Sequence, residues 1–147
     1  MDCCSTSAEP AAQIVDCPRC GQRGRTVGDA TLDALLTAPA QRAPGGWRFC
    51  RNPMCAAVYF HGQDGAILGK DALSVRVGQK DRAADRPICY CFDHSAEELV
   101  QRPSIADDIK AACRRGEDRC AQTNPQGSCC LGNVAAVLKT AAQEVSA

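Results

Sequence analysis

The stretches CPRC, residues 17–20, and CRNPMC, residues 50–55, each place two cysteines at short spacing. A small sheet that brings these two turns together would gather four thiolates around one point, and tetrahedral sulfur coordination suits Zn²⁺. We expect a structural zinc, because four thiolates leave no open coordination position. His61 is an alternative ligand, although a histidine in a polar turn is expected to be exposed. The predicted zinc ligands are Cys17, Cys20, Cys50 and Cys55.

A second set of cysteines lies in CYC, residues 89–91, and CAQTNPQGSCC, residues 120–130. This spacing is not typical of zinc sites and suits a 2Fe–2S cluster, which takes four thiolates around two irons. The NPQG segment is expected to fold the intervening residues over the cluster. Cys130 is favoured over Cys129 because it falls inside the first turn of a predicted helix, where free N–H groups and the helix dipole stabilise anionic sulfur. The predicted cluster ligands are Cys89, Cys91, Cys120 and Cys130, with Cys129 as the alternative to Cys130.

Three of the twelve cysteines lie outside both sets and their alternative. Cys3 and Cys4 form a vicinal pair that is a candidate transient site for a soft ion such as Cu(I), Hg(II) or As(III), or simply part of an unimportant tail. Cys113 shares a predicted helix face with Ile105 and Ile109, so we expect it to be a buried hydrophobic side chain. Whichever of Cys129 and Cys130 does not bind iron is a candidate second transient ligand.

The compartment decides whether paired cysteines are metal ligands or disulfides. The first residues, MDCCSTSAEP, contain neither a basic start nor an apolar run of signal-peptide length. No stretch approaches the ~18 apolar residues of a membrane span. We therefore expect a cytoplasmic protein with reduced thiols, whose cysteine pairs bind metals.

Charge and motifs exclude several classes of function. The chain has 17 basic and 17 acidic residues, which gives no basic surface for a nucleic-acid backbone. Neither of its two histidines, His61 and His94, lies in a nucleophile motif, and there is no P-loop or dinucleotide-binding glycine motif. We do not expect an enzyme, apart from a possible one-electron reduction of a metal ion.

The sequence predicts an α+β protein in which a small β-rich zinc-binding module precedes a helical 2Fe–2S module. Aromatic residues make up only 4% of the chain, so each core is small and metals are expected to support it. The predicted parts are a flexible tail at 1–15, the zinc-binding module at 16–80, a polar linker at 81–86 and the helical module at 87–147.

In the first module, Asp29 is a plausible N-cap for a helix over 31–36. Strands are predicted at 47–50, 58–60 and 66–68, with a further candidate at 74–77. In the second module, Ser95 and Glu98 form a capping-box pattern that begins a helix ended by Pro103. Ser104 is expected to cap the next helix, which ends at Gly116, and a last helix is predicted over about 130–144.

Taken together, these motifs resemble a known family. CPRCG followed by FCRNPMCAAVYF resembles the zinc module of CopZ-type copper chaperones. CYCF, a helical stretch and then CAQTNPQGSCCLG resemble the cluster-binding part of the same N-terminal region, which is itself similar to bacterioferritin-associated ferredoxin-like modules. The resemblance covers about residues 17–139.

The resemblance implies one zinc, one 2Fe–2S cluster and a role in copper handling. It implies Cu(I) as cargo, a copper-exporting ATPase as a partner, and reduction of Cu(II) or electron transfer at the cluster. CopZ-type chaperones continue into a ferredoxin-like copper-binding domain with a Met-x-Cys-x-x-Cys loop, and this sequence has no such motif. We expect either a stand-alone relative or a piece of a longer protein.

Three functions follow as hypotheses. The first is a metallochaperone or metal-resistance protein with a redox cluster. The second is a 2Fe–2S electron carrier that exchanges electrons with a redox partner and has no metal-transfer role. The third is a structural or interaction protein that carries two inert metal sites.

Overall fold

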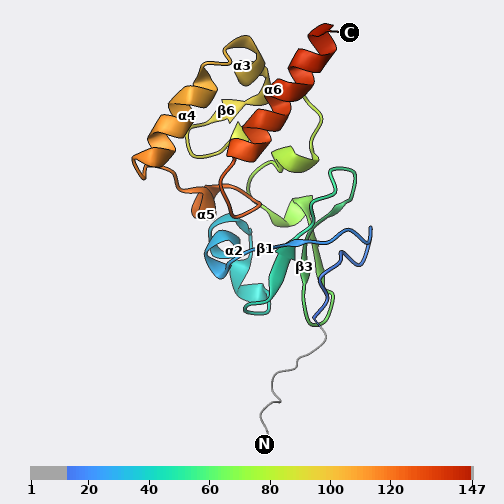
Figure 1. Ribbon diagram of the computed structural model, residues 1–147. Coiled ribbons are helices and arrows are strands. Elements are labelled where there is room, and N and C mark those ends of the chain that lie inside the picture. Colours follow the sequence, from blue (N-terminus) through green and yellow to red (C-terminus); the bar gives the residue numbers. More distant parts are fainter. Residues whose placement is uncertain (1–12, 147) are drawn as a thin grey trace, which may run out of the picture.

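The computed structural model describes residues 13–146. The pair Cys3–Cys4 lies outside the described residues. The described part is a mixed α+β structure, as the sequence predicts, in which a four-stranded antiparallel sheet is followed by a helical region. Figure 1 shows the sheet in the lower half of the molecule, with the helices α3, α4 and α6 above it.

The sheet has the strand order β1-β2-β3-β4, and each strand is antiparallel to its neighbours. It contains every strand predicted for the first module except the candidate at 74–77, and it adds a short strand that was not predicted. The strands are β1 (Arg25–Thr26), β2 (Trp47–Phe49), β3 (Ala57–His61) and β4 (Ile67–Gly69). β3 is buried along its whole length, which agrees with a sequence, AVYFH, that does not alternate between apolar and polar residues.

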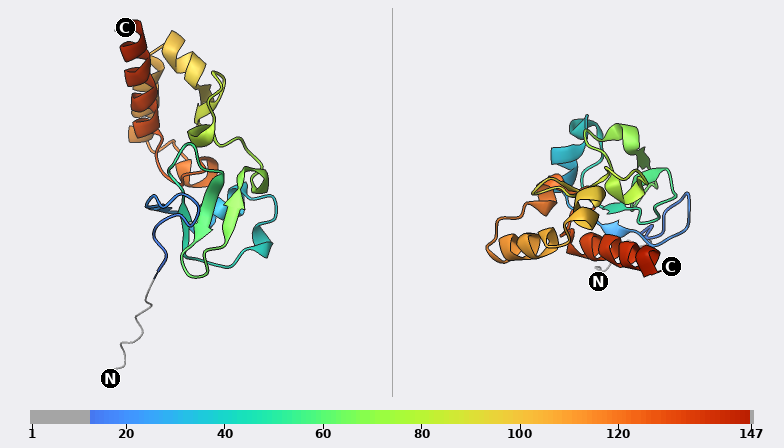
Figure 2. Two further views of the ribbon diagram at one scale, coloured as in Figure 1. Left: turned by 90° about the vertical axis from the view of Figure 1, so that its right-hand side faces the viewer. Right: turned by 90° about the horizontal axis from the view of Figure 1, so that it is seen from above.

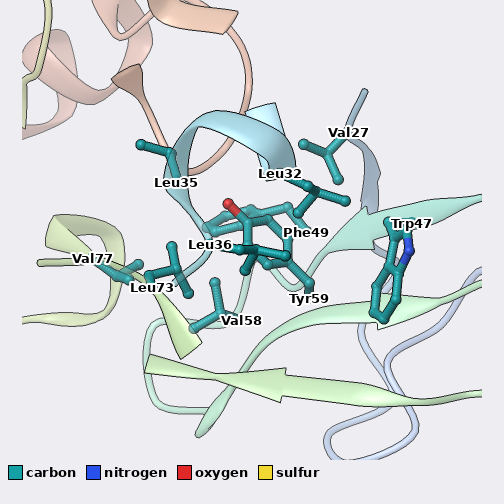
Figure 3. Close-up of a cluster of buried hydrophobic side chains, with 10 residues drawn as sticks. All are labelled: Val27, Leu32, Leu35, Leu36, Trp47, Phe49, Val58, Tyr59, Leu73 and Val77. Carbon is teal, nitrogen blue, oxygen red and sulfur yellow. The ribbon is translucent and has the colours of Figure 1, made fainter. Parts of the chain in front are cut away.

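Helix α2 (Asp29–Leu35) covers the sheet and forms the first core with it (Figure 3). Leu32 and Leu35 of the helix are buried in one cluster with Phe49, Val58 and Tyr59 of the strands. Burying this apolar surface stabilises the unit at roughly 25 cal/mol per Å² removed from water.

Two local predictions for this unit were wrong. Gly28, not Asp29, is the N-cap of α2, and no side chain caps this helix, so Asp29 instead places its charge in the first turn, where it complements the helix dipole. The candidate strand at 74–77 is not formed, because Ser74 bonds back to the end of α2 through both its backbone N–H (2.8 Å) and its hydroxyl (3.0 Å), each to Leu35 O.

The helical region begins with a two-stranded antiparallel hairpin, and its helices pack around a second core. The elements are β5 (Pro87–Cys89), β6 (His94–Ser95), α3 (Ala96–Gln101), α4 (Ile105–Arg114), α5 (Cys120–Thr123) and α6 (Leu131–Ser146). Three short 3-10 turns, Pro39–Gln41, Lys70–Ala72 and Gly78–Lys80, complete the structure. Figure 2 shows α6 running alongside α3 and α4.

The helix boundaries of this region follow local rules closely. The predicted capping box is confirmed, since Ser95 Oγ accepts from Glu98 N–H and the Glu98 carboxylate accepts from Ser95 N–H. Ser104 is the N-cap of α4, but its side chain makes no capping hydrogen bond. Gly116 follows α4 with a φ of +73°, the left-handed conformation that ends a helix.

The loop between α5 and α6 lies against the sheet unit, and α5 packs directly on α2 (Figure 1). Thr31 Oγ1 donates to Ala121 O at 2.6 Å, and Tyr59 Oη donates to Pro125 O at 2.5 Å. Gly127 adopts a φ of +73°, and a Cβ there would lie 2.9 Å from Val27 Cγ2. The sheet unit, which carries Cys17, Cys20, Cys50 and Cys55, therefore holds in place the segment that carries Cys120, Cys129 and Cys130.

Candidate metal centres

The four cysteines of the first set converge on one point. Their sulfurs all lie within 4.8 Å of one another, and three of the four residues are buried while Cys20 is half-buried. Sγ of Cys17 lies 3.9 Å from Sγ of Cys55, and Sγ of Cys20 lies 3.6 Å from Sγ of Cys50. These separations fit four thiolates around a single tetrahedral ion.

Two tight turns present these sulfurs. In the first, Cys17 N–H donates to Gln22 O and Gly21 N–H donates to Cys17 O, and Gly21 adopts the positive φ of 80° that the turn requires. In the second, Asn52 closes the turn through two bonds: its carbonyl accepts from Cys55 N–H and its side chain accepts from Met54 N–H. Strands β2 and β3 flank the second turn, so the sheet fixes its distance from the first.

The cysteines of the second set also meet, although they come from the β5–β6 hairpin and from the α5–α6 segment. Cys91 Sγ lies 3.4 Å from Cys120 Sγ, and Cys89 and Cys130 belong to the same buried core cluster. Cys89, Cys120 and Cys130 are buried and Cys91 is half-buried. The sulfurs of the second set are spread more widely than those of the first. Within residues 13–146, the first set is the one group of three or more candidate metal ligands whose ligand atoms all lie within 4.8 Å of one another.

Comparison with known proteins gives the same picture. Residues 14–74 match the CopZ zinc-finger family model, described as a zinc binding domain. The chain is 31% identical over 121 residues to the copper chaperone CopZ of Archaeoglobus fulgidus, an alignment that covers 80% of this chain and 58% of the relative. The X-ray structure of the Archaeoglobus fulgidus CopZ N-terminal domain superposes with a TM-score of 0.67 and 29% identity, covering 83% of this chain and 96% of that one.

The chain is homologous to the N-terminal domain of CopZ. The resemblance stated from the sequence motifs is thereby confirmed, and with it a four-cysteine zinc-binding site in the sheet unit. The chain spans 58% of the length of the curated relative that it matches. None of the helices in residues 13–146 is both long enough and apolar enough to cross a membrane.

The surroundings of the zinc site shift the pKa values of two of its thiols, Cys50 and Cys20, in opposite directions. Burial raises the pKa of Cys50 to about 12, and the nearby Lys80 ammonium opposes this rise. Desolvation also acts against Cys20, but hydrogen bonds from the backbone at Gln22 and from the Asn52 side chain outweigh it and lower the pKa of Cys20 to about 7. The four cysteines would hold Zn²⁺ as thiolates, so the protons that remain would be released when the ion binds.

Lys80 is a residue of this CopZ-like site that sequence reasoning missed. Its side chain is only 5% exposed, and Nζ donates to Asn52 O at 2.7 Å and Cys55 O at 3.4 Å. It also lies 5.7 Å from the centre of the Phe49 ring. Four thiolates around Zn²⁺ carry a net charge of about −2, and a buried cation bonded to the turn that holds two of them offsets it. Nothing in the cysteine spacing points to a lysine beyond the turn.

His61 is not part of the four-cysteine group, and the expectation that it is exposed was wrong. The side chain is 5% exposed, because His61 ends β3 and packs beside Trp47, with ring centres 5.0 Å apart. Its Nδ1 pairs with Asp64 at 3.0 Å and its Nε2 with Gly45 O at 2.9 Å. Both ring nitrogens are thus engaged.

Several polar groups surround the second set. Arg119 N–H donates to Cys91 Sγ at 2.9 Å, and Thr123 Oγ1 lies 3.3 Å from the same sulfur. Hydrogen bonding from Cys130 lowers the pKa of Cys120 to about 6 and lowers that of Cys89, while the pKa of Cys130 itself is strongly raised by these two partners. A bound cluster would remove the thiol protons that remain, because metal ions bind the thiolates.

The structure separates the two adjacent cysteines clearly. Cys130 is 1% exposed and belongs to the second core, next to Val134, whereas Cys129 is exposed. Cys113 is half-buried against the same core, and burial raises its pKa to about 11.

Proposed function

We propose that this chain is the metal-bearing N-terminal part of a copper-handling protein, with one structural zinc and one redox-active 2Fe–2S cluster. The carrying observation is the convergence of four thiols from two distant segments in a mostly buried site, in a chain homologous to a copper chaperone. The proposed zinc ligands are Cys17, Cys20, Cys50 and Cys55. The proposed cluster ligands are Cys89, Cys91, Cys120 and Cys130.

The geometry of the second set supports a cluster rather than a single ion. Its sulfurs are spread more widely than those of the zinc site, as two irons require. When bound, a 2Fe–2S cluster supplies one-electron transfer. The Arg119 N–H bond to Cys91 stabilises anionic sulfur, and such bonds are one means by which a protein sets a cluster's reduction potential.

Burial also suggests where electrons pass. Cys89 and Cys130 are enclosed by the second core, while Cys91 stands on the hairpin between β5 and β6 and remains half-exposed. A donor or acceptor would approach on the Cys91 side. The proposed cargo is Cu(I), the proposed partners are a copper-exporting ATPase or a redox protein, and the proposed compartment is the cytoplasm.

A second candidate function is electron transfer with no metal-transfer role. The half-exposed edge at Cys91 supports it, because an electron carrier needs such an edge. The Cys3–Cys4 pair, proposed as a transient soft-metal site, separates the two: replacing both by Ser lowers Cu(I) affinity only if the chain handles copper through its tail.

Metal analysis of the anaerobically purified protein tests the proposal. We expect one zinc and two irons per chain, with a visible spectrum that bleaches on reduction by dithionite. Cys120→Ser should remove the iron and keep the zinc, and Cys50→Ser should remove the zinc. A colourless, iron-free protein whose cysteines form disulfides would overturn the proposal.

A further inference from the structure

Thr123 brings a hydroxyl group to the half-exposed side of the second set of cysteines. It is the last residue of α5, and Cys120 is the first. Residues three apart lie on the same face of a helical turn, which explains why both side chains reach the β5–β6 hairpin. Thr123 Oγ1 lies 3.3 Å from Cys91 Sγ, and Cys120 Sγ lies 3.4 Å from the same atom. The segment CAQT thus places a polar side chain beside two of the proposed cluster ligands.

The Thr123 hydroxyl has two acceptors within reach and only one proton to donate. Besides lying close to Cys91 Sγ, it donates to Arg119 O at 2.9 Å. That carbonyl oxygen also accepts from the backbone N–H groups of Gln122 at 2.9 Å and of Thr123 at 3.0 Å, which occupy its two lone pairs. The backbone of α5 therefore does not require the hydroxyl, which is free to turn toward the sulfur.

The direction of a bond between Thr123 and Cys91 follows from the chemistry of a metal-bound cysteine. Such a cysteine is a thiolate, so its sulfur has no proton to donate and only accepts. The hydroxyl is then the one donor of the pair. The Arg119 N–H already donates to this sulfur at 2.9 Å, so Thr123 supplies a second bond to the same atom. Hydrogen bonds to an anionic acceptor are stronger than those to a neutral one.

We propose that the Thr123 hydroxyl donates to Cys91 Sγ and holds the reduction potential of the proposed cluster higher than Arg119 alone would. A thiolate on reduced iron carries more negative charge than one on oxidised iron, so a donor to it stabilises the reduced form more. The hydroxyl only rotates: its proton stays on Thr123, and the redox partner loses the one electron that the centre gains. The inference rests on the proposed function at one point, the assignment of Cys91 to a 2Fe–2S cluster.

Redox titration of the iron-loaded full chain, followed in the visible spectrum, tests this role. Thr123→Val keeps the size and branching of the side chain and removes the hydroxyl. We expect its midpoint potential to fall by up to about 59 mV, the shift for a tenfold change in a one-electron equilibrium. Thr123→Ala removes the hydroxyl in a second way and should shift in the same direction. Thr123→Ser keeps the hydroxyl and should titrate as the unsubstituted chain does.

Thr31→Val is the matched control. It removes a different hydroxyl bond to α5, the one from Thr31 Oγ1 to Ala121 O, and it leaves both donors to Cys91 in place. Its midpoint potential should be unchanged, because the packing of α5 on α2 does not alter the charge on the sulfur.

The iron content and the spectrum of the same samples separate the possible failures. An unchanged potential in Thr123→Val, with iron and spectrum intact, would overturn the role of Thr123 and leave the proposed function standing. Equal shifts in Thr123→Val and Thr31→Val, or in Thr123→Val and Thr123→Ser, would also overturn it, because the hydroxyl would then not be the cause. An unsubstituted chain without iron would overturn the proposed function and this inference with it.

Discussion

At the scale of single residues, cysteine spacing is the strongest information in the sequence. CPRC and CRNPMC predict a four-sulfur site because short spacing is itself the geometric requirement, and the structure brings these four sulfurs together. The burial of Lys80 and His61 could not be predicted, because it depends on contacts between residues that are distant in the chain. The burial of Lys80 depends on the tertiary packing of a segment distant from both turns, and that of His61 depends on contacts with Trp47 and Gly45.

Replacing Lys80 by Met should weaken zinc binding. Met keeps the apolar stem but removes the cation and its bonds to Asn52 O and Cys55 O, which leaves the charge of the thiolates uncompensated. We expect zinc affinity to fall by about 10–100-fold, the range for groups that support metal ligands. Competition with a zinc chelator measures it.

Lys139→Met is the control for this experiment, because Lys139 is exposed on α6. It should bind zinc as the unsubstituted chain does. Equal zinc affinity in both variants would mean that Lys80 plays no part in the site.

At the scale of elements, signals that act within one turn of chain predict well, and signals that need a distant partner do not. The Ser95–Glu98 capping box is formed as predicted because all its atoms lie within one helical turn. Helix α5 and strand β1 were missed, since neither has a pattern of its own: α5 is a short turn against α2, and β1 is a two-residue pairing with β2.

Ser95→Ala should destabilise the helical region by about 1 kcal/mol, the usual cost of losing a helix N-cap. The substitution removes the bond from Glu98 N–H to Ser95 Oγ, whereas the backbone N–H of residue 95 can still donate to the Glu98 carboxylate. Urea unfolding of the metal-loaded protein measures the change.

Ser104→Ala provides a matched comparison. Ser104 is also an N-cap, but its side chain makes no capping bond, so the free energy of unfolding should change little. A cost at Ser104 as large as that at Ser95 would contradict the assignment of stability to the capping box.

Gly127 and Gly116 form a second matched pair. Both have a φ of +73°, which an L-residue adopts at a cost of roughly 1–2 kcal/mol, so this cost is common to Gly127→Ala and Gly116→Ala. Only at Gly127 would the new methyl group meet other atoms, Val27 Cγ2 at 2.9 Å and Thr31 Oγ1 at 3.0 Å, whereas Gly116 faces open space. We expect Gly127→Ala alone to push the α5–α6 loop off the sheet unit and to speed iron loss to a chelator, and equal rates for the two variants would argue against this contact.

At the scale of the whole molecule, the sequence predicts two modules in order and an α+β fold, but not how the modules meet. Their contact depends on Thr31, Tyr59 and the loop from Cys120 to Cys130, which are far apart in the chain. No periodicity or spacing reports such a contact. The sequence also does not give the spacing of the sulfurs in the second set, because two of the four cysteines lie in that loop.

Removing zinc should therefore weaken the proposed cluster. Cys50→Ser disturbs the turn between β2 and β3, and β3 carries Tyr59, whose hydroxyl holds Pro125 O. We expect faster iron loss in this variant, followed by the decay of the visible spectrum in the presence of an iron chelator. Cys3→Ser, which removes a thiol that belongs to neither proposed metal set, is the control. An unchanged rate of iron loss in Cys50→Ser would mean that the two centres are independent.

The support of one unit by the other has a consequence for the living cell. Under zinc starvation, newly made copies of this chain would hold the proposed iron centre less firmly, and the electron transfer proposed for that centre would fall as well. Zinc supply would then limit the proposed electron transfer, although Zn²⁺ itself takes no part in redox chemistry.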